Sequence, residues 1–165
     1  DIRAAVDWLE QSGYENIGIV GTSLGSAFAF LASTFDKRLK VNVFNHCSAR
    51  FGDVVWTGLS TRHIKASLEQ HLTLERLQTV WDSMSPRFYM DEFAKHQEKK
   101  NLFIYTTYDT TFLPQYSKEI LACVKASGAP HKLVVLPCGH YTMGETPFKF
   151  VVGYHIISHI ARKLG

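Results

Sequence analysis

The pentapeptide Gly21-Thr22-Ser23-Leu24-Gly25 has the pattern G-x-S-x-G, in which the central serine can act as a nucleophile. An apolar run of strand composition, Ile17 to Val20, precedes it, and a helical stretch rich in Ala, Phe and Leu follows to about Phe35. This context predicts a nucleophile elbow, a sharp strand-to-helix turn that holds Ser23 in strained backbone geometry. Glycines at positions 21 and 25 are expected to prevent side-chain clashes between strand and helix. The amide of Leu24, at the start of the helix, is a candidate donor to an oxyanion.

A serine becomes nucleophilic when a histidine takes its proton, and a carboxylate keeps that histidine in the required tautomer. Asp109 and His140 are the candidates, because each follows an apolar, strand-like run and the chain order is Ser, then acid, then His. The two runs are Leu102 to Tyr105 and Leu133 to Leu136. Since the carboxyl ends of parallel strands meet at one edge of a sheet, we expect the three side chains to form a catalytic triad there.

Two other residues compete for these roles. His46 and Asp53 both follow a further strand-like run, Val41 to Phe44, and are therefore expected at the same edge of the sheet. His46 is an alternative base or a residue of the substrate pocket, and Asp53 is an alternative acid.

Helical patterns alternate with these strand-like runs. Helices are predicted from Ile2 to about Leu9, from Tyr116 to Ala126, and from near Pro147 toward the C-terminus. The alternation predicts the α/β fold class, with a mostly parallel sheet flanked by helices.

The segment from about Trp56 to Lys100 is too long for a simple connection and is mostly helical in pattern. We expect residues 56–100 to form a helical cap or lid, with an ordinary crossover helix as the alternative. Ser85-Pro86 is a candidate N-cap and first helical residue. Trp56 and Trp81, together with His46, are candidate substrate-binding residues, although aromatics in this segment would equally build a small core of the cap.

The composition argues against several classes of function. The 165 residues are 45% hydrophobic and 20% charged with a net charge of +3, as in a chain that folds around a core. The short basic runs Lys37 to Lys40 and Glu98 to Lys100 are expected to be solvated turn residues, so no nucleic-acid-binding face is indicated. No apolar run approaches the ~18 residues of a membrane span. Three cysteines at irregular spacing predict neither a disulfide framework nor a zinc site.

These segments resemble those of the α/β-hydrolase superfamily. The elbow Gly-Thr-Ser-Leu-Gly, Asp109 followed shortly by Leu113-Pro114, and the pair Gly139-His140 are similar to the triad segments of that family. The resemblance covers residues 1–165 and implies the C-terminal part of the catalytic domain, with the 56–100 insertion in the cap position. In the family, the first half of the fold supplies the second oxyanion amide, and no residue here is assigned to that role. We expect an upstream segment of roughly 80–150 residues, or self-association, to complete the sheet.

The expected function is that of a serine hydrolase that cleaves a small-molecule carboxylic ester through an acyl-enzyme intermediate. This chemistry requires no metal or organic cofactor. A thioesterase or a peptidase would use the same triad, so both remain alternatives. A further alternative is a non-catalytic binding protein that keeps the fold.

Overall fold

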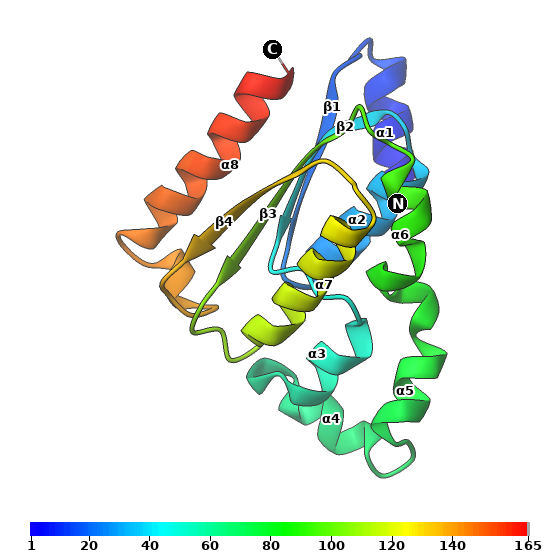
Figure 1. The fold of residues 1–165 in the computed structure, drawn as a ribbon, viewed down its shortest axis with the longest axis vertical. Helices are drawn as coiled ribbons and strands as arrows, with labels where there is room; N and C mark the ends of the chain where they lie inside the picture. The colour runs from blue at the N-terminus through cyan, green and yellow to red at the C-terminus, as the bar shows by residue number, and fades with distance from the viewer. Residues whose placement is uncertain (165) are drawn as a thin grey trace.

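The computed structural model describes residues 1 to 164 and contains a sheet of four parallel strands with helices on both faces (Figure 1). The strands are β1 (Ile17–Thr22), β2 (Leu39–Asn45), β3 (Lys100–Thr106) and β4 (His131–Leu136), and they lie side by side in sequence order. Each predicted strand is present and extends beyond its apolar run, because polar residues at the strand ends still join the backbone ladder. The predicted α/β class and parallel sheet are confirmed.

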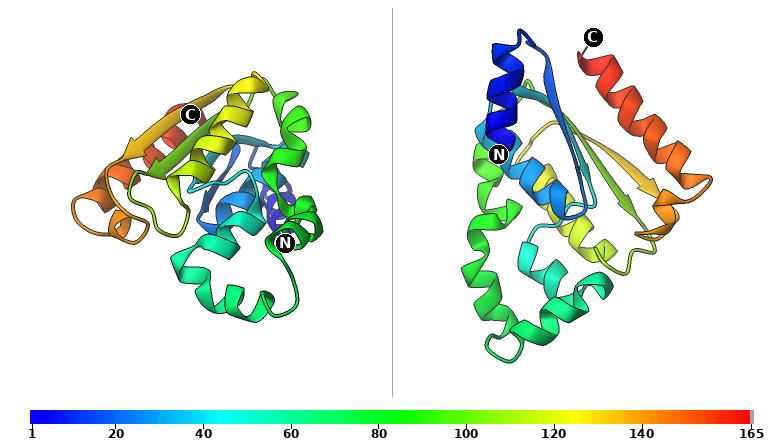
Figure 2. Two further views of the ribbon diagram at one scale, coloured as in Figure 1. Left: turned by 60° about the horizontal axis from the view of Figure 1, so that its bottom comes forward. Right: turned by 180° about the vertical axis from the view of Figure 1, so that it is seen from behind.

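The helices cover the two faces of the sheet unequally. α1 (Ile2–Gln11), α2 (Leu24–Phe35) and α7 (Pro114–Ala126) lie on one face, and α8 (Phe148–Leu164) lies on the other (Figure 1; Figure 2). β2 and β3 are buried along nearly their whole length, as expected for central parallel strands between two helical layers. Phe44 and Phe103 pack with α2 and α7 on one face, and Val43, Leu102 and Ile104 pack with α8 on the other.

Between β2 and β3 the chain forms a series of short helices. They are α3 (Phe51–Thr57), α4 (Arg62–Leu68), α5 (Leu74–Val80) and α6 (Met90–Ala94), joined by turns of 3-10 helix at Leu59–Thr61, Asp82–Met84 and Pro86–Tyr89. The helical segment begins at Phe51, ahead of the predicted start at Trp56. Ser85 is the N-cap and Pro86 the first residue of the last of these 3-10 turns, as predicted.

The two halves of this segment have different surroundings. α3, α4 and α5 lie beyond the carboxyl ends of the strands (Figure 1). α6 instead contributes Met90 and Phe93 to the main core, where Phe93 stacks on Phe30 of α2. The first half therefore has the place of a cap, while α6 packs as a crossover helix does. A single cap over residues 56–100 stays a prediction.

Two basic residues that the sequence led us to expect in solvated turns have structural roles. Lys99 is fully buried, and its ammonium donates to the carbonyls of Ser33 and Asp36 at the end of α2. Burial lowers the pKa of Lys99 to about 8, while acceptors at a helix C-terminus favour the cation. Arg38 forms ion pairs with Asp36 and with two carboxylates of α1. The prediction is wrong for Lys99, because sequence order does not show that its side chain reaches a helix end. Arg38 lies in a turn and is partly exposed, as predicted, and its ion pairs are an addition to that prediction.

β1 and β4 are the edges of the sheet as far as residues 1–164 define it. Large apolar side chains are exposed beside β1, at Val20, Leu24 and Phe28, and along α8, at Tyr154 and Ile157. Every helix in the described range is too short or too polar to span a bilayer.

Candidate active site

Ser23 forms the turn between β1 and α2 and has an unusual backbone conformation. Its φ is 57° and its ψ is −126°, a combination that residues other than glycine rarely adopt. Its amide donates to the carbonyl oxygen of Asn45 at 2.9 Å, which ties the turn to the end of β2. A strained serine at a strand-to-helix turn has the geometry of a nucleophile elbow.

Gly21 is required by this turn, whereas Gly25 is not. A Cβ atom on Gly21 would lie 2.4 Å from the carbonyl oxygen of Gly25 and 2.5 Å from Cβ of Ala29. Apart from its chain neighbours and the backbone of its own helix, a Cβ atom on Gly25 would meet no atom of the described residues within 4 Å. The prediction that both glycines prevent clashes is therefore wrong for Gly25, because that residue lies on an exposed side of α2.

Leu24 is the first residue of α2, so its amide has no acceptor within the helix. An amide in this position carries part of the positive end of the helix dipole. It is therefore free to donate to a negatively charged oxygen next to Ser23.

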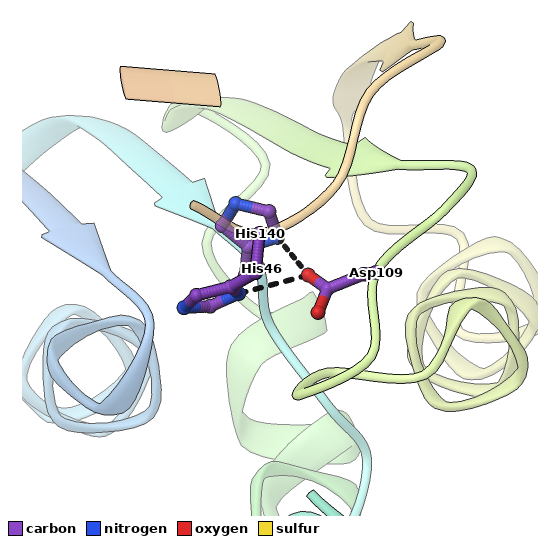
Figure 3. A group of neighbouring side chains, drawn as sticks. All are labelled: His46, Asp109 and His140. Carbon is purple, nitrogen blue, oxygen red and sulfur yellow. Dashed lines mark hydrogen bonds and ion pairs between the residues drawn. The ribbon is translucent and has the colours of Figure 1, made fainter. Parts of the chain in front are cut away.

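Asp109 and His140 are in direct contact at the carboxyl ends of β3 and β4 (Figure 3). Nδ1 of His140 lies 2.9 Å from Oδ2 of Asp109. The other carboxylate oxygen, Oδ1, accepts the amides of Thr111 and Phe112, both at 2.8 Å. These amides fix the carboxylate in its loop and leave Oδ2 to orient His140. Asp53, the alternative acid, is bonded by the side chain of Gln78 instead.

Asp109 is almost fully buried and nevertheless holds its charge. Burial alone would raise its pKa. The hydrogen bonds from His140 and the amide of Thr111, together with the close contact of His46, outweigh burial and hold the pKa well below the ordinary value. A carboxylate that stays ionised can stabilise the cation that forms when His140 takes a proton.

His46 is a second histidine on the same carboxylate oxygen (Figure 3). Its Nδ1 lies 2.8 Å from Oδ2 of Asp109, and its ring centre lies 4.5 Å from that of His140. The side chain of His46 is only 1% exposed, compared with 11% for His140. Because a general base must exchange protons with the substrate, His140 is better placed for that role than the enclosed His46.

A cavity of about 270 Å³ lies beside Ser23. Its walls come from the elbow, α3, α4, the turn after α5 and the loop after β3, and none of the residues that line it carries a charge: Ser23, Leu24, Phe51, Val54, Val55, Ser60, Thr61, Ile64, Trp81, Thr111 and Phe112. Of the predicted substrate-binding residues, Trp81 lines the cavity. Trp56 lies outside its wall, under the ammonium of Lys65, and His46 is buried behind Asp109.

Two features connect Ser23 to the Asp109–His140 pair. Phe112 lines the cavity together with Ser23 and stacks on the ring of His140, with centroids 5.6 Å apart. The hydroxyl of Ser26 lies 2.7 Å from the carbonyl oxygen of Ser23 and 2.8 Å from that of His46. The serine and the pair therefore lie at the same edge of the sheet. A hydrogen bond from Oγ of Ser23 to His140 stays a prediction.

His46, Asp109 and His140 also bring three atoms of metal-ligating type within 4.8 Å of one another. A metal requires ligands that face a common centre at about 2.0–2.2 Å from each. Here both histidine nitrogens face Oδ2 at hydrogen-bonding distance, and Oδ1 is occupied by two backbone amides. This geometry suits proton sharing better than metal coordination.

The cysteines near the site have the properties of unreactive thiols. Burial raises the pKa of Cys47 to about 12. Burial and the charge of Asp109 raise the pKa of Cys138. A thiol that stays protonated is a poor nucleophile, so neither residue competes with Ser23. All three cysteines of the chain are free.

Sequence reasoning missed Thr111 and Phe112, whose amides hold the acid. The signal was present in the run Asp109-Thr110-Thr111, because an aspartate in a turn commonly accepts the amide two residues further along. The sequence placed His46 at the same sheet edge as Asp109 and named it an alternative base, but it did not indicate that both histidines would contact one carboxylate oxygen.

Comparison with protein-family models gives no match, and no curated protein matches the sequence. Solved structures match in fold. An acylaminoacyl peptidase of Pyrococcus horikoshii has a TM-score of 0.74 at 16% identity, and a puromycin-hydrolysing peptidase of Mycobacterium tuberculosis has 0.78 at 16%. An esterase of Pyrococcus furiosus has a TM-score of 0.71 at 18% identity. The chain has the α/β-hydrolase fold.

The part of the α/β-hydrolase fold present here is limited. The alignments cover 97% to 100% of this chain but only 26% and 25% of the two peptidases and 61% of the esterase. At these identities the likeness establishes the fold and leaves the reaction to be argued from the site.

Proposed function

We propose that this chain carries the catalytic residues of a serine hydrolase that cleaves a carboxylic ester through an acyl-enzyme intermediate. The observation that carries the proposal is the bonded Asp109–His140 pair at the sheet edge where Ser23 occupies a strained elbow. The fold comparisons support acyl-bond hydrolysis as the class, because the similar structures are named as peptidases and an esterase.

In this mechanism His140 takes the proton of Ser23 while Oγ attacks the carbonyl carbon. Asp109 holds the tautomer of His140 and stabilises its cation. The Leu24 amide donates to the oxyanion, a contact worth roughly 3 kcal/mol in measured cases. His140 then gives its proton to the leaving alcohol, and the acyl group remains on Ser23. A water molecule attacks the acyl-enzyme with His140 again as base, and the acid product and free Ser23 result.

The cavity beside Ser23 favours a substrate with a compact uncharged group. Its lining is dominated by aliphatic and aromatic side chains, including Trp81. A charged group there would lose its hydration without gaining an ion pair. Of the three residues that the sequence suggested for substrate binding, Trp81 has direct support because it lines the cavity, and Trp56 and His46 do not line it.

A peptidase is the second candidate, because two of the similar structures carry that name. Matched substrates separate the two reactions. An ester and an anilide with the same apolar acyl group differ only in the bond that is cleaved. Faster turnover of the ester, by more than the intrinsic difference between the bonds, supports the esterase assignment. Comparable turnover of the anilide would favour the peptidase.

We expect a fluorophosphonate probe to label the protein at Ser23, because only an activated serine reacts with it. Ser23→Ala should abolish labelling and reduce ester turnover to near background while circular dichroism shows an unchanged fold. Ser60→Ala is a matched control, since Ser60 lines the same cavity and should be dispensable. Labelling that persists in Ser23→Ala, or that is lost in Ser60→Ala instead, would show that the nucleophile is wrongly assigned. A wild-type protein that takes no label would support the non-catalytic alternative.

A further inference from the structure

The backbone of His46 has a conformation that requires support. Its φ is 57°, and it follows directly after β2. Its amide donates to the carbonyl oxygen of Ile104 at 2.8 Å, and its own carbonyl oxygen lies 2.8 Å from the hydroxyl of Ser26. Non-glycine residues in the left-handed region are uncommon, and they persist where the surroundings hold them at a functional position.

The strained backbone directs the ring of His46 toward Asp109 (Figure 3). Nδ1 is 2.8 Å from Oδ2, although the N–H points off the direct line to the oxygen, so the contact is a bent one. A nitrogen lone pair at this distance would be repelled by the carboxylate, so the contact favours a hydrogen on Nδ1. Nε2 then carries a buried lone pair without a partner in the described chain.

Through these contacts His46 is linked to every member of the proposed triad. The hydroxyl of Ser26 bridges the carbonyl oxygens of His46 and Ser23. Nδ1 of His46 lies against Asp109, and the ring of His46 lies against the ring of His140. The ring of His46 is fully enclosed. It therefore acts on the proposed chemistry through Asp109 and His140, without touching substrate.

The ionisable groups around His46 and His140 come from three segments. The loop after β3 provides Asp109 and Tyr108, whose amide bonds the carbonyl of Cys138. The loop after β4 provides Cys138 and Tyr141, and Tyr141 packs edge-on against His140. The segment after β2 adds Cys47, a buried thiol with a raised pKa. Asp109 is the charged group that contacts both histidines.

We propose that His46 is a positioning residue that shares the Asp109 carboxylate with His140 and so limits how strongly that carboxylate holds the protonated base. The proposal rests on the proposed function. The ring of His46 and the hydroxyl of Thr106, which lies 3.5 Å from Oδ2, both compete with His140 for the charge of that oxygen. His46 is the closer of the two competitors, and the bond from His140 is therefore weaker than it would be alone. When the carboxylate holds the protonated base less tightly, that base returns its proton to the leaving group more readily.

The test compares two substitutions in the otherwise unchanged protein. His46→Phe fills the same space without a donor. His46→Asn keeps an N–H near the position of Nδ1, and asparagine also tolerates a positive φ. If His46→Phe fails to fold, His46→Gln replaces it, because the longer side chain carries its amide past the position of Nδ1.

We expect His46→Phe to move the acid limb of the pH profile of kcat/KM upward by about 0.5–1 pH unit. We expect kcat to fall about tenfold, with KM within about twofold, because the more tightly held His140 cation returns its proton less readily while the substrate site is untouched. His46→Asn should restore both. In proton NMR, the pH midpoint of the His140 Cε1–H signal should rise with the acid limb, and the His140 Nδ1–H resonance should move downfield as its bond to Asp109 strengthens.

An unmoved midpoint in His46→Phe, or equal losses in the Phe and Asn variants, would overturn the proposal and leave His46 a packing residue. The NMR measurement needs no turnover. Failure of the proposed function, seen as absent probe labelling of the wild type, is thereby distinguished from failure of the role given to His46.

Discussion

Asp109 stays ionised although it is almost fully buried, because hydrogen-bond donors contact both of its carboxylate oxygens. Two backbone amides hold Oδ1, and two histidines face Oδ2. This arrangement ties the chemistry of the site to the stability of the loop after β3, since the same contacts that orient His140 also fix the loop.

The charge of Asp109 makes stability depend on pH. Its pKa in the folded protein lies below the ordinary value of 3.8, so ionised Asp109 contributes stability that is fully present above about pH 5 and is lost as the pH falls through 3.8 toward the folded value. We expect Asp109→Asn to lower the free energy of unfolding by about 1–3 kcal/mol at neutral pH, and by clearly less near pH 3. Denaturant titrations at the two pH values measure the difference.

The exposed Asp91 of α6 provides a matched control for this measurement. Asp91→Asn removes the same charge from a solvated surface and should change the free energy of unfolding little at either pH. If the destabilisation by Asp109→Asn were equal at neutral and acid pH, the assigned charge of Asp109 would be incorrect.

The sequence placed Ser23, Asp109 and His140 at one sheet edge because each follows a strand, and strand order alone brings such residues together. It left His46 with two open roles, alternative base or pocket residue, and did not indicate that His46 and His140 would share Asp109. The backbone conformation of His46 and its approach to Asp109 depend on how the ends of β2 and β3 pack. Local sequence patterns carry no information about such long-range contacts. The misjudged Gly25 has a similar cause, since the rotation of α2 about its axis decides whether Gly25 faces β1.

At the scale of elements, the elbow depends on how closely α2 crosses β1. We expect Gly21→Ala to destabilise the protein severely, because its Cβ would overlap backbone and side-chain atoms of α2 that cannot move independently. Gly25→Ala should be neutral or stabilising by up to about 1 kcal/mol, since alanine favours the helix and has open space there. Thermal unfolding of both variants measures the contrast, and similar melting temperatures would contradict the crossing geometry.

The strands and long helices were predictable because apolar periodicity marks them directly. The connection between β2 and β3 was less predictable. Its first helix starts at Phe51, in a segment without a clear helical start signal, and α6 packs into the main core although it was grouped with the cap. Burial of Lys99 was unpredictable for the same reason: the carbonyl acceptors at the end of α2 become its partners only after the sheet forms.

At the scale of the whole molecule, the central strands of the sheet are more fully covered than the edge strand β1. β2 and β3 are enclosed, whereas β1 has one unpaired edge within residues 1–164. Val20, Leu24 and Phe28 are each more than 40% exposed beside that edge, and Tyr154 and Ile157 of α8 are more than 60% exposed. An unpaired parallel strand next to large exposed apolar side chains invites further pairing, since it leaves backbone donors and acceptors free.

We therefore expect residues 1–165, expressed alone, to self-associate. Sedimentation velocity should show dimers or larger species whose proportion rises with concentration, because association covers the apolar surface beside β1. Val20→Lys, which places a charge on the exposed side of that strand, should shift the distribution toward monomer without disturbing the buried face. Turnover of ester by the isolated chain should stay low, because the Leu24 amide is the one oxyanion donor that we assign within the described residues. A stable monomer with full esterase activity would show that neither the edge of β1 nor the oxyanion site needs completion.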